Sequence, residues 1–83
     1  MTNYSLIPEM TLASITNYVE RRVPPSSFLQ AVLSNNLRES FACADENNRA
    51  AMFEIVSYCY WKIPADCWGS PEKVAAYLRD SKP

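Results

Sequence analysis

Apolar residues recur along most of this chain at the three- and four-residue steps of an α-helix. Over residues 8–22, Leu12, Ile15 and Val19 fall on one side of such a helix, and this spacing predicts a buried stripe. The segment begins with a proline, which suits a first helical turn because its missing N–H needs no partner there. Pro24 predicts the end of the helix, because the residue before a proline avoids the helical region.

The next helical region, residues 26–44, is interrupted in its middle. An apolar face over two turns consists of Phe28, Leu29, Val32 and Leu33, and helical spacing continues through Leu37, Phe41 and Ala44. Asn35 and Asn36 stand between the two parts, and asparagine is a poor interior residue of a helix but a good cap. The pattern predicts two short helices or one bent helix.

Residues 47–62 form the most apolar segment of the chain. A helix that is apolar on most of its sides usually lies at the centre of a domain, so we expect this helix to be the most buried. Any of Asp45, Asn47 or Asn48 is suited to cap it. Its predicted inner face holds Met52, Ile55, Val56 and Cys59, widened by Phe53, Tyr60 and Trp61.

A helix over residues 71–80 has the clearest local start in the sequence. Ser70 is a capping residue, Pro71 fits the first helical position, and Glu72 suits the positive end of the helix dipole. The predicted inner stripe consists of Val74, Tyr77 and Leu78.

These elements together predict an all-α fold, a compact bundle of four to five short helices. Residues 1–83 fit one helical domain, with an ordered core over about residues 8–80. The chain has one glycine and six prolines, which favours helices separated by proline breaks over hairpins that need glycine at their turns.

The composition and charge of the chain indicate which classes of partner are unfavourable for this domain. Apolar residues make up 48% of the chain and charged residues 20%, with a formal net charge of -1, which is typical of a globular domain and disfavours nucleic acid as a partner. No apolar run approaches the roughly 20 residues of a membrane span, and no secretory signal is visible. We therefore expect a cytoplasmic protein with no membrane partner, in which Cys43, Cys59 and Cys67 are free thiols.

The chain lacks the residues on which most catalytic and metal sites depend. It has no histidine, which removes the commonest general base and a principal metal ligand. Three scattered cysteines make a poor zinc site, and a single glycine cannot form a phosphate-binding loop. Glu39, Glu54 and Asp66 have no spacing that pairs them. We predict no enzymatic activity, no metal and no cofactor.

Aromatic and basic residues are the candidates for a binding site. Tyr58 and Trp61 are three residues apart and share a helix face, and aromatic and arginine side chains are enriched at protein interfaces. Tyr60 and Trp68 are better explained as core residues with polar tips at its rim. The predicted partner-binding residues are Tyr58, Trp61, Arg49, Arg21, Arg22 and Lys62.

Two other polar segments of the chain have more than one explanation. The asparagines and acids between residues 35 and 48 could present a face that mimics nucleic acid to a basic partner, although a solvated turn with helix caps explains them as well. Asn47, Asn48 and Arg49 loosely fit the start of a recognition helix in a helix-turn-helix. The acidic balance of the chain disfavours that interpretation.

An ordered set of short motifs resembles a family of small proteins encoded by bacteriophages and prophages. The set runs through Pro24-Pro25, Ser27-Phe28-Leu29, Ala31-Val32-Leu33 and Asn35-Asn36-Leu37, and ends with the segment Trp68–Glu72. The resemblance spans roughly residues 8–79 and implies an origin rather than an activity, with no catalytic residues to carry over.

The resemblance implies a phage-encoded accessory protein, acting in the host cytoplasm, that binds and modulates a host protein or protein complex. An inhibitor of bacterial defence, similar in role to an anti-CRISPR protein, is one such function. The alternatives are a helical homo-oligomer that sequesters a nucleotide with Tyr58, Trp61 and Arg49, and a DNA-binding regulator.

Overall fold

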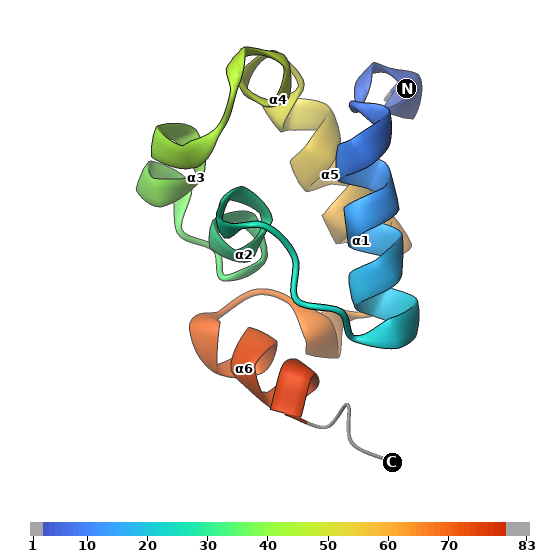
Figure 1. Cartoon of the computed structure of the whole chain (residues 1–83), viewed down its shortest axis with the longest axis vertical. Helices are drawn as coiled ribbons and strands as arrows, with labels where there is room; N and C mark the ends of the chain where they lie inside the picture. Colours follow the sequence, from blue (N-terminus) through green and yellow to red (C-terminus); the bar gives the residue numbers. More distant parts are fainter. Residues whose placement is uncertain (1–2, 80–83) are drawn as a thin grey trace.

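The structure, a computed structural model, describes residues 3–79, and within that range it contains helices and no strand (Figure 1). The all-α prediction is confirmed. The described residues hold six α-helices, against the four to five expected, and two short 3-10 helices. In chain order they are η1 (Tyr4–Leu6), α1 (Glu9–Arg21), α2 (Ser27–Leu33), α3 (Leu37–Cys43), α4 (Glu46–Ala50), α5 (Met52–Lys62), η2 (Ala65–Cys67) and α6 (Pro71–Arg79).

The helix ends follow the capping residues of the sequence. The side chain of Ser26 accepts the backbone N–H of Leu29 at the start of α2, and Asn36 accepts that of Glu39 at the start of α3. Each bond satisfies one of the N–H groups that a helix leaves unpaired in its first turn. The asparagine interruption therefore separates two helices rather than bending one.

Helices α4 and α6 also begin at residues whose side chains cap them. Asp45, among the three candidates, is the cap of α4, and its carboxylate accepts the N–H of Asn48 at 2.8 Å. Ser70 accepts the N–H of Lys73 and so caps α6 as predicted. The segment predicted as one helix over 47–62 is divided at Ala51, which lies between α4 and α5. Asp80, predicted as the end of α6, lies outside the described residues.

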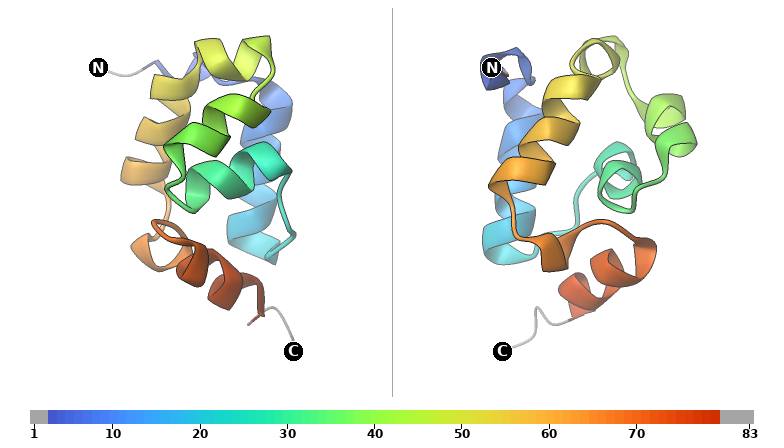
Figure 2. Two further views of the ribbon diagram at one scale, coloured as in Figure 1. Left: turned by 90° about the vertical axis from the view of Figure 1, so that its left-hand side faces the viewer. Right: turned by 180° about the vertical axis from the view of Figure 1, so that it is seen from behind.

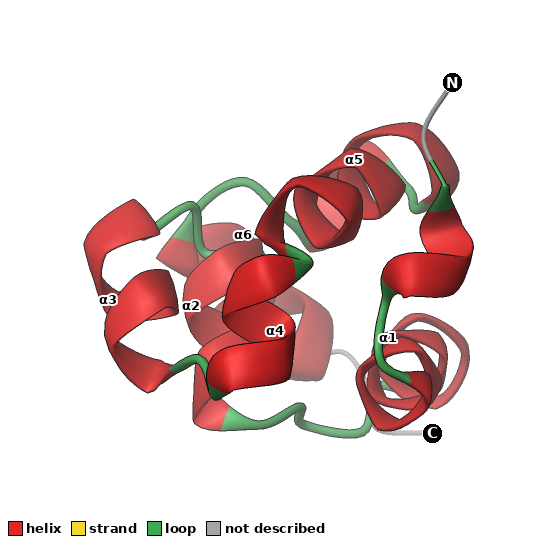
Figure 3. Ribbon diagram, turned by 90° about the horizontal axis from the view of Figure 1, so that it is seen from above, coloured by secondary structure: helices red, strands yellow, loops and turns green. Residues whose placement is uncertain are grey.

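Helix α2 lies at the middle of the fold. Seen from behind in Figure 2, α5 and α3 stand on opposite sides of it and α6 crosses below. The view from above in Figure 3 shows α3 at one end, with α5 and α1 towards the other end on opposite edges of the fold. Helix α2 packs against both α3 and α6.

The expectation that the segment 47–62 is the most buried helix is wrong. Five of the seven residues of α2 are buried, whereas α5 buries only Met52, Ile55 and Cys59 of its eleven. Val56, which was expected in the core, is exposed. The reason is position: α2 lies between α3 and α6 near the middle of the domain, whereas α5 lies at its edge and leaves part of its surface uncovered.

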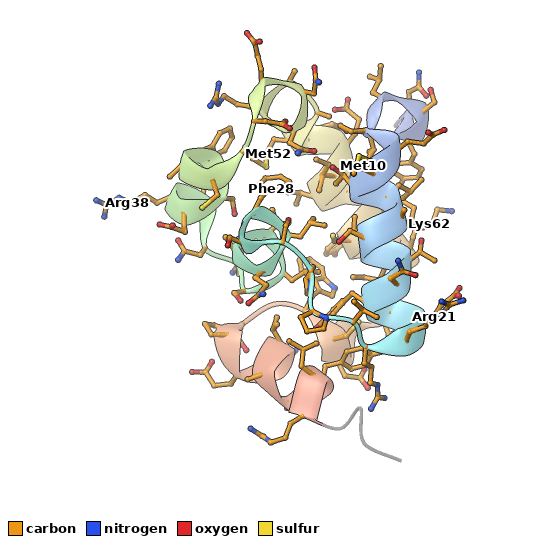
Figure 4. The ribbon with its side chains drawn as sticks, in the orientation of Figure 1. Met10, Arg21, Phe28, Arg38, Met52 and Lys62 are labelled. Atoms are coloured by element: carbon orange, nitrogen blue, oxygen red, sulfur yellow. The ribbon has the colours of Figure 1, made fainter. Side chains whose placement is uncertain are left out.

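One apolar cluster joins the helices. Figure 4 shows Phe28 of α2 and Met52 of α5 turned into the interior, while Arg21, Arg38 and Lys62 point outwards. In α1 the fully covered residues are Thr11, Ile15 and Tyr18, and the predicted stripe residues Leu12 and Val19 are half-buried against the cluster. The buried members of the cluster are Ile7, Ile15, Tyr18, Phe28, Leu29, Val32, Leu33, Ala44, Ala51, Met52, Ile55, Cys59, Ile63, Cys67 and Val74.

Three hydrogen bonds fasten the C-terminal part of the described chain to the rest. The hydroxyl of Tyr18, fully buried in α1, donates to the carbonyl of Cys67 at 2.6 Å. The hydroxyl of Tyr77 in α6 donates to the carbonyl of Val19 in α1. The backbone N–H of Gly69 donates to the carbonyl of Leu33 at the end of α2. These bonds hold η2 and α6 against α1 and α2.

Gly69 also has a conformation that favours glycine. Its φ is +117°, a region that residues with a Cβ rarely adopt. The turn interpretation of the segment around Trp68 is therefore supported by the backbone itself.

Replacing Tyr18 with Phe is expected to destabilise the protein by about 1–3 kcal/mol, because the buried carbonyl of Cys67 would lose the hydroxyl that donates to it. Urea unfolding followed by circular dichroism would measure the change in the free energy of unfolding. Tyr77→Phe is the matched variant: its ring is only half-buried, so water can partly replace the lost bond and the destabilisation should be smaller. Equal stability of Tyr18→Phe and the native protein would contradict this role.

Candidate functional site

Helix α5 carries two apolar stripes, and the domain covers only one of them. Met52, Ile55 and Cys59 form the first stripe and are buried. Phe53, Val56 and Tyr60 repeat the same spacing one residue later, and so lie about 100° around the helix from the first. All three residues of this second stripe are exposed.

The second stripe leads into a group of aromatic rings. Phe53 is 69% exposed and Tyr60 is 62% exposed. The ring of Tyr60 makes an edge-to-face contact with Trp61, with ring centroids 4.7 Å apart, and a second one with Trp68 at 6.3 Å. Trp61 is itself 70% exposed. Tyr60 and Trp61 thus contact each other while both stay mostly exposed, and the half-buried Trp68 joins them to the domain.

Helix α3 continues this apolar surface. Leu37 and Phe41 are four residues apart on one face of α3 and are both exposed. Leu37 lines a small hollow together with Val56 of α5 and Trp68, so the exposed apolar residues of the two helices border the same depression. We call the set Leu37, Phe41, Phe53, Val56, Tyr60 and Trp61 the α3–α5 surface.

The size of the α3–α5 surface sets it apart from scattered exposed residues. An aromatic side chain has roughly 150–250 Å² of surface to bury, so the exposed fractions above correspond to an apolar area on the order of 600 Å². This total is at the upper end of the range for the largest apolar patch on a typical monomer, about 300–600 Å², and such patches are often functional. The α3–α5 surface is therefore the main candidate site of the described residues.

The predicted binding residues Tyr58 and Lys62 lie on another side of α5, towards the N-terminal segment. The half-buried ring of Tyr58 contacts the edge of Tyr4, with ring centroids 5.4 Å apart. The ammonium of Lys62 lies 5.8 Å from the same Tyr4 ring, and both residues line a hollow with Glu20 of α1. Trp61, which was expected to share a face with Tyr58, instead packs against Tyr60.

The predicted arginines are dispersed. Arg21 is exposed at the end of α1. Arg22 takes a left-handed conformation after α1, and its guanidinium lies 4.3 Å from the centroid of the Tyr77 ring. Arg49 donates to the carbonyl of Ala44 within its own region. The structure therefore does not gather the six predicted residues into one surface, and only Trp61 belongs to the α3–α5 surface.

The polar segment between α2 and α5 is used for structure. Asn36 and Asp45 cap helices, and the side chain of Asn48 accepts a hydrogen bond from the Thr11 hydroxyl, which joins α4 to α1. Glu39 accepts the Sγ–H of Cys43. These contacts support the capping interpretation over a dedicated binding face.

Two of the three thiols are interior groups. Cys59 and Cys67 are fully buried, and all three cysteines are free. Burial, followed by the neighbouring Cys67 thiol, raises the pKa of Cys59 to about 12. Burial also raises the pKa of Cys67, whose Sγ–H donates to the carbonyl of Pro64. Both thiols stay protonated at neutral pH and are poor nucleophiles.

The remaining thiol, Cys43, is exposed but is not activated. Its hydrogen bond to the Glu39 carboxylate raises its pKa, because the negative neighbour disfavours the thiolate. Over residues 3–79, no three His, Cys, Asp or Glu side chains are grouped as a metal site would require. None of the helices in that range has the length and apolar character needed to cross a membrane.

Sequence reasoning placed most of the α3–α5 surface in the core. The sequence signal for this surface is that α5 has two apolar stripes with the same spacing. Positions 53, 56 and 60 follow positions 52, 55 and 59 one residue later. A small domain can bury one such stripe at its edge, and the second stripe then faces outwards. The spacing alone does not say which of the two stripes is covered.

Comparisons with protein-family models, with characterised protein sequences and with solved structures find no match to this chain. The resemblance to small phage proteins therefore stays a prediction from the motifs quoted above.

Alkylation is expected to separate the thiols. Iodoacetamide at neutral pH should add one group to the native protein, at Cys43, and three groups in denaturant, since Cys59 and Cys67 are buried and protonated. Intact-mass spectrometry counts the groups added. Glu39→Gln should speed the reaction of Cys43 because it removes the neighbouring negative charge. Rapid addition of three groups to the native protein would contradict the assignment.

Proposed function

We propose that this chain is a small phage-encoded accessory protein that binds a host protein through the α3–α5 surface and modulates its activity. The observation that carries this proposal is the second apolar stripe of α5, which the fold leaves uncovered. Exposed aromatic side chains lower the solubility of a protein and add nothing to its core. A contiguous group of them on a small domain therefore indicates a surface that contacts another protein. Inhibition of a bacterial defence complex is the form of modulation we favour.

The energetics of the surface fit binding to a protein. Covering on the order of 600 Å² of apolar surface at about 25 cal/mol per Å² contributes roughly 15 kcal/mol. Association costs about 4–15 kcal/mol in lost freedom, so the gain is sufficient only when the partner packs closely. The central residues Phe53, Tyr60 and Trp61 are of the types that dominate such interfaces.

The proposal of a phage origin and of a host target rests on the ordered motifs of the sequence. In the structure those motifs have structural roles: Phe28, Leu29, Val32 and Leu33 are core residues, and Gly69 makes the turn before α6. The motifs therefore define the scaffold. Target choice would depend on the α3–α5 surface, of which only Leu37 belongs to the quoted motifs.

The alternatives receive less support from the site geometry. A hollow of about 540 Å³ between the N-terminal segment and α4 is large enough for a ligand, but its one charged lining residue is Glu9, which would repel the phosphates of a nucleotide. For a DNA-binding regulator, α4 is only five residues long, and Asn48 and Arg49 are engaged within the domain. Protein binding remains the proposal.

Capture from host lysate tests the proposed function. Immobilised native protein should retain a stoichiometric host protein, and Phe53→Glu should reduce its recovery at least about tenfold, because a charge at the centre of an apolar contact is left unpaired. Phe53 is mostly exposed, so this variant should keep its fold, which circular dichroism would verify.

Met10→Glu is the matched control for capture. Met10 is 86% exposed on α1 and lies outside the α3–α5 surface, so the same change of an exposed apolar residue to a carboxylate should leave recovery unchanged. Equal capture by all three proteins would refute the assignment of the surface. No retained protein under several lysate conditions would refute the function.

A further inference from the structure

We infer that the α3–α5 surface also takes a second copy of this chain, with α5 of one copy packed antiparallel against α5 of the other. This inference rests on the proposed function, because it assigns an additional occupant to the same surface. In this arrangement the free protein is a dimer that covers its own apolar surface, and a host protein competes with the second copy for it.

The exposed stripe has the symmetry that such a pairing needs. A two-fold interface brings one surface against itself, so that a contact from residue i to residue j recurs from j to i. Phe53, Val56 and Tyr60 are spaced by three and four residues along α5. An antiparallel pairing about a two-fold axis near Val56 therefore places Phe53 of each copy opposite Tyr60 of the other. Trp61 on one flank and α3 on the other widen the contact.

The hollow beside the stripe suits a side chain rather than a separate ligand. Its volume is about 90 Å³, and Leu37, Val56 and Trp68 line it. That is about three times the share of one water in the liquid, roughly 30 Å³, whereas small-molecule pockets are about 300–1,000 Å³. One apolar side chain of the second copy is of the size that fills it.

The area involved meets the requirement of a stable dimer. If each copy covers on the order of 600 Å² of the α3–α5 surface, the pair buries about 1,200 Å², the lower end of stable protein interfaces. Backbone and polar atoms at the rim add to this total. The six residues of the surface carry no formal charge, and each chain has a net charge of only -1, so electrostatic repulsion between copies is small.

Analytical ultracentrifugation of the full chain tests the dimer. The native protein should sediment as a dimer at micromolar concentrations, and Phe53→Glu should weaken the dimer at least about tenfold because it places a carboxylate in the apolar contact. The matched control, Met10→Glu, should dimerise like the native protein. A native protein that stays monomeric, or a Phe53→Glu variant that dimerises as tightly as the native one, would overturn the inference.

Mixing charged variants tests the antiparallel register. Phe53→Glu mixed with Tyr60→Lys should form a heterodimer, because the introduced carboxylate and ammonium face each other while the second Phe53–Tyr60 contact is intact. Phe53→Glu mixed with Phe53→Lys should stay monomeric. In the antiparallel pairing, position 53 of one copy faces position 60 of the other, so the introduced carboxylate and ammonium do not meet. The opposite result would mean parallel helices and would overturn the pairing.

The same experiments separate this inference from the proposed function. A monomeric native protein that still captures a host protein, with capture lost in Phe53→Glu, would remove the dimer and leave the host-binding surface in place. A dimer that captures no host protein would support the inference about the second copy and remove the proposed function.

Discussion

The rest of the structure depends on the incomplete coverage of α5: the domain packs its inner stripe and its Tyr58 side, and leaves its outer stripe uncovered. Its inner stripe meets the apolar cluster built by α1, α2 and the N-terminal segment. No further helix among the described residues lies over the outer stripe: α3 borders it across the hollow that Leu37 and Val56 line, and α6 crosses below α2 (Figure 2). The uncovered apolar surface is the consequence of this arrangement.

The position of α6 is fixed by polar contacts as much as by burial. The hydroxyls of Tyr18 and Tyr77 bind carbonyls on η2 and α1, and Gly69 binds the end of α2. A buried carbonyl without a donor is costly, so these bonds resist displacement of the C-terminal segment. They keep α6 away from the outer stripe of α5. The exposure of Phe53 and Tyr60 is thus a property of the folded state and not of a loosely attached helix.

This division of roles gives each group of residues one physical task. The buried thiols act as small apolar side chains, Asn36 and Asp45 cap helices, and the tyrosines of α1 and α6 join elements that are far apart in sequence. The exposed apolar residues of α3 and α5 remain without such a task in the monomer. Contact with another protein surface, from a host or from a second copy, is the use that their chemistry allows.

The sequence by itself determined several helix starts, because capping depends on neighbouring residues, but it did not show the division between α4 and α5 at Ala51. Ser26, Asn36 and Ser70 cap helices through groups only three residues away, and proline acts on the residue beside it. The tertiary structure decided which apolar face is covered. Ile55 and Val56 are adjacent and chemically alike, yet one is buried and the other exposed. That difference depends on where α1, α2 and α6 lie, and their places depend on long-range bonds such as that from Tyr18 to Cys67, which local spacing does not encode.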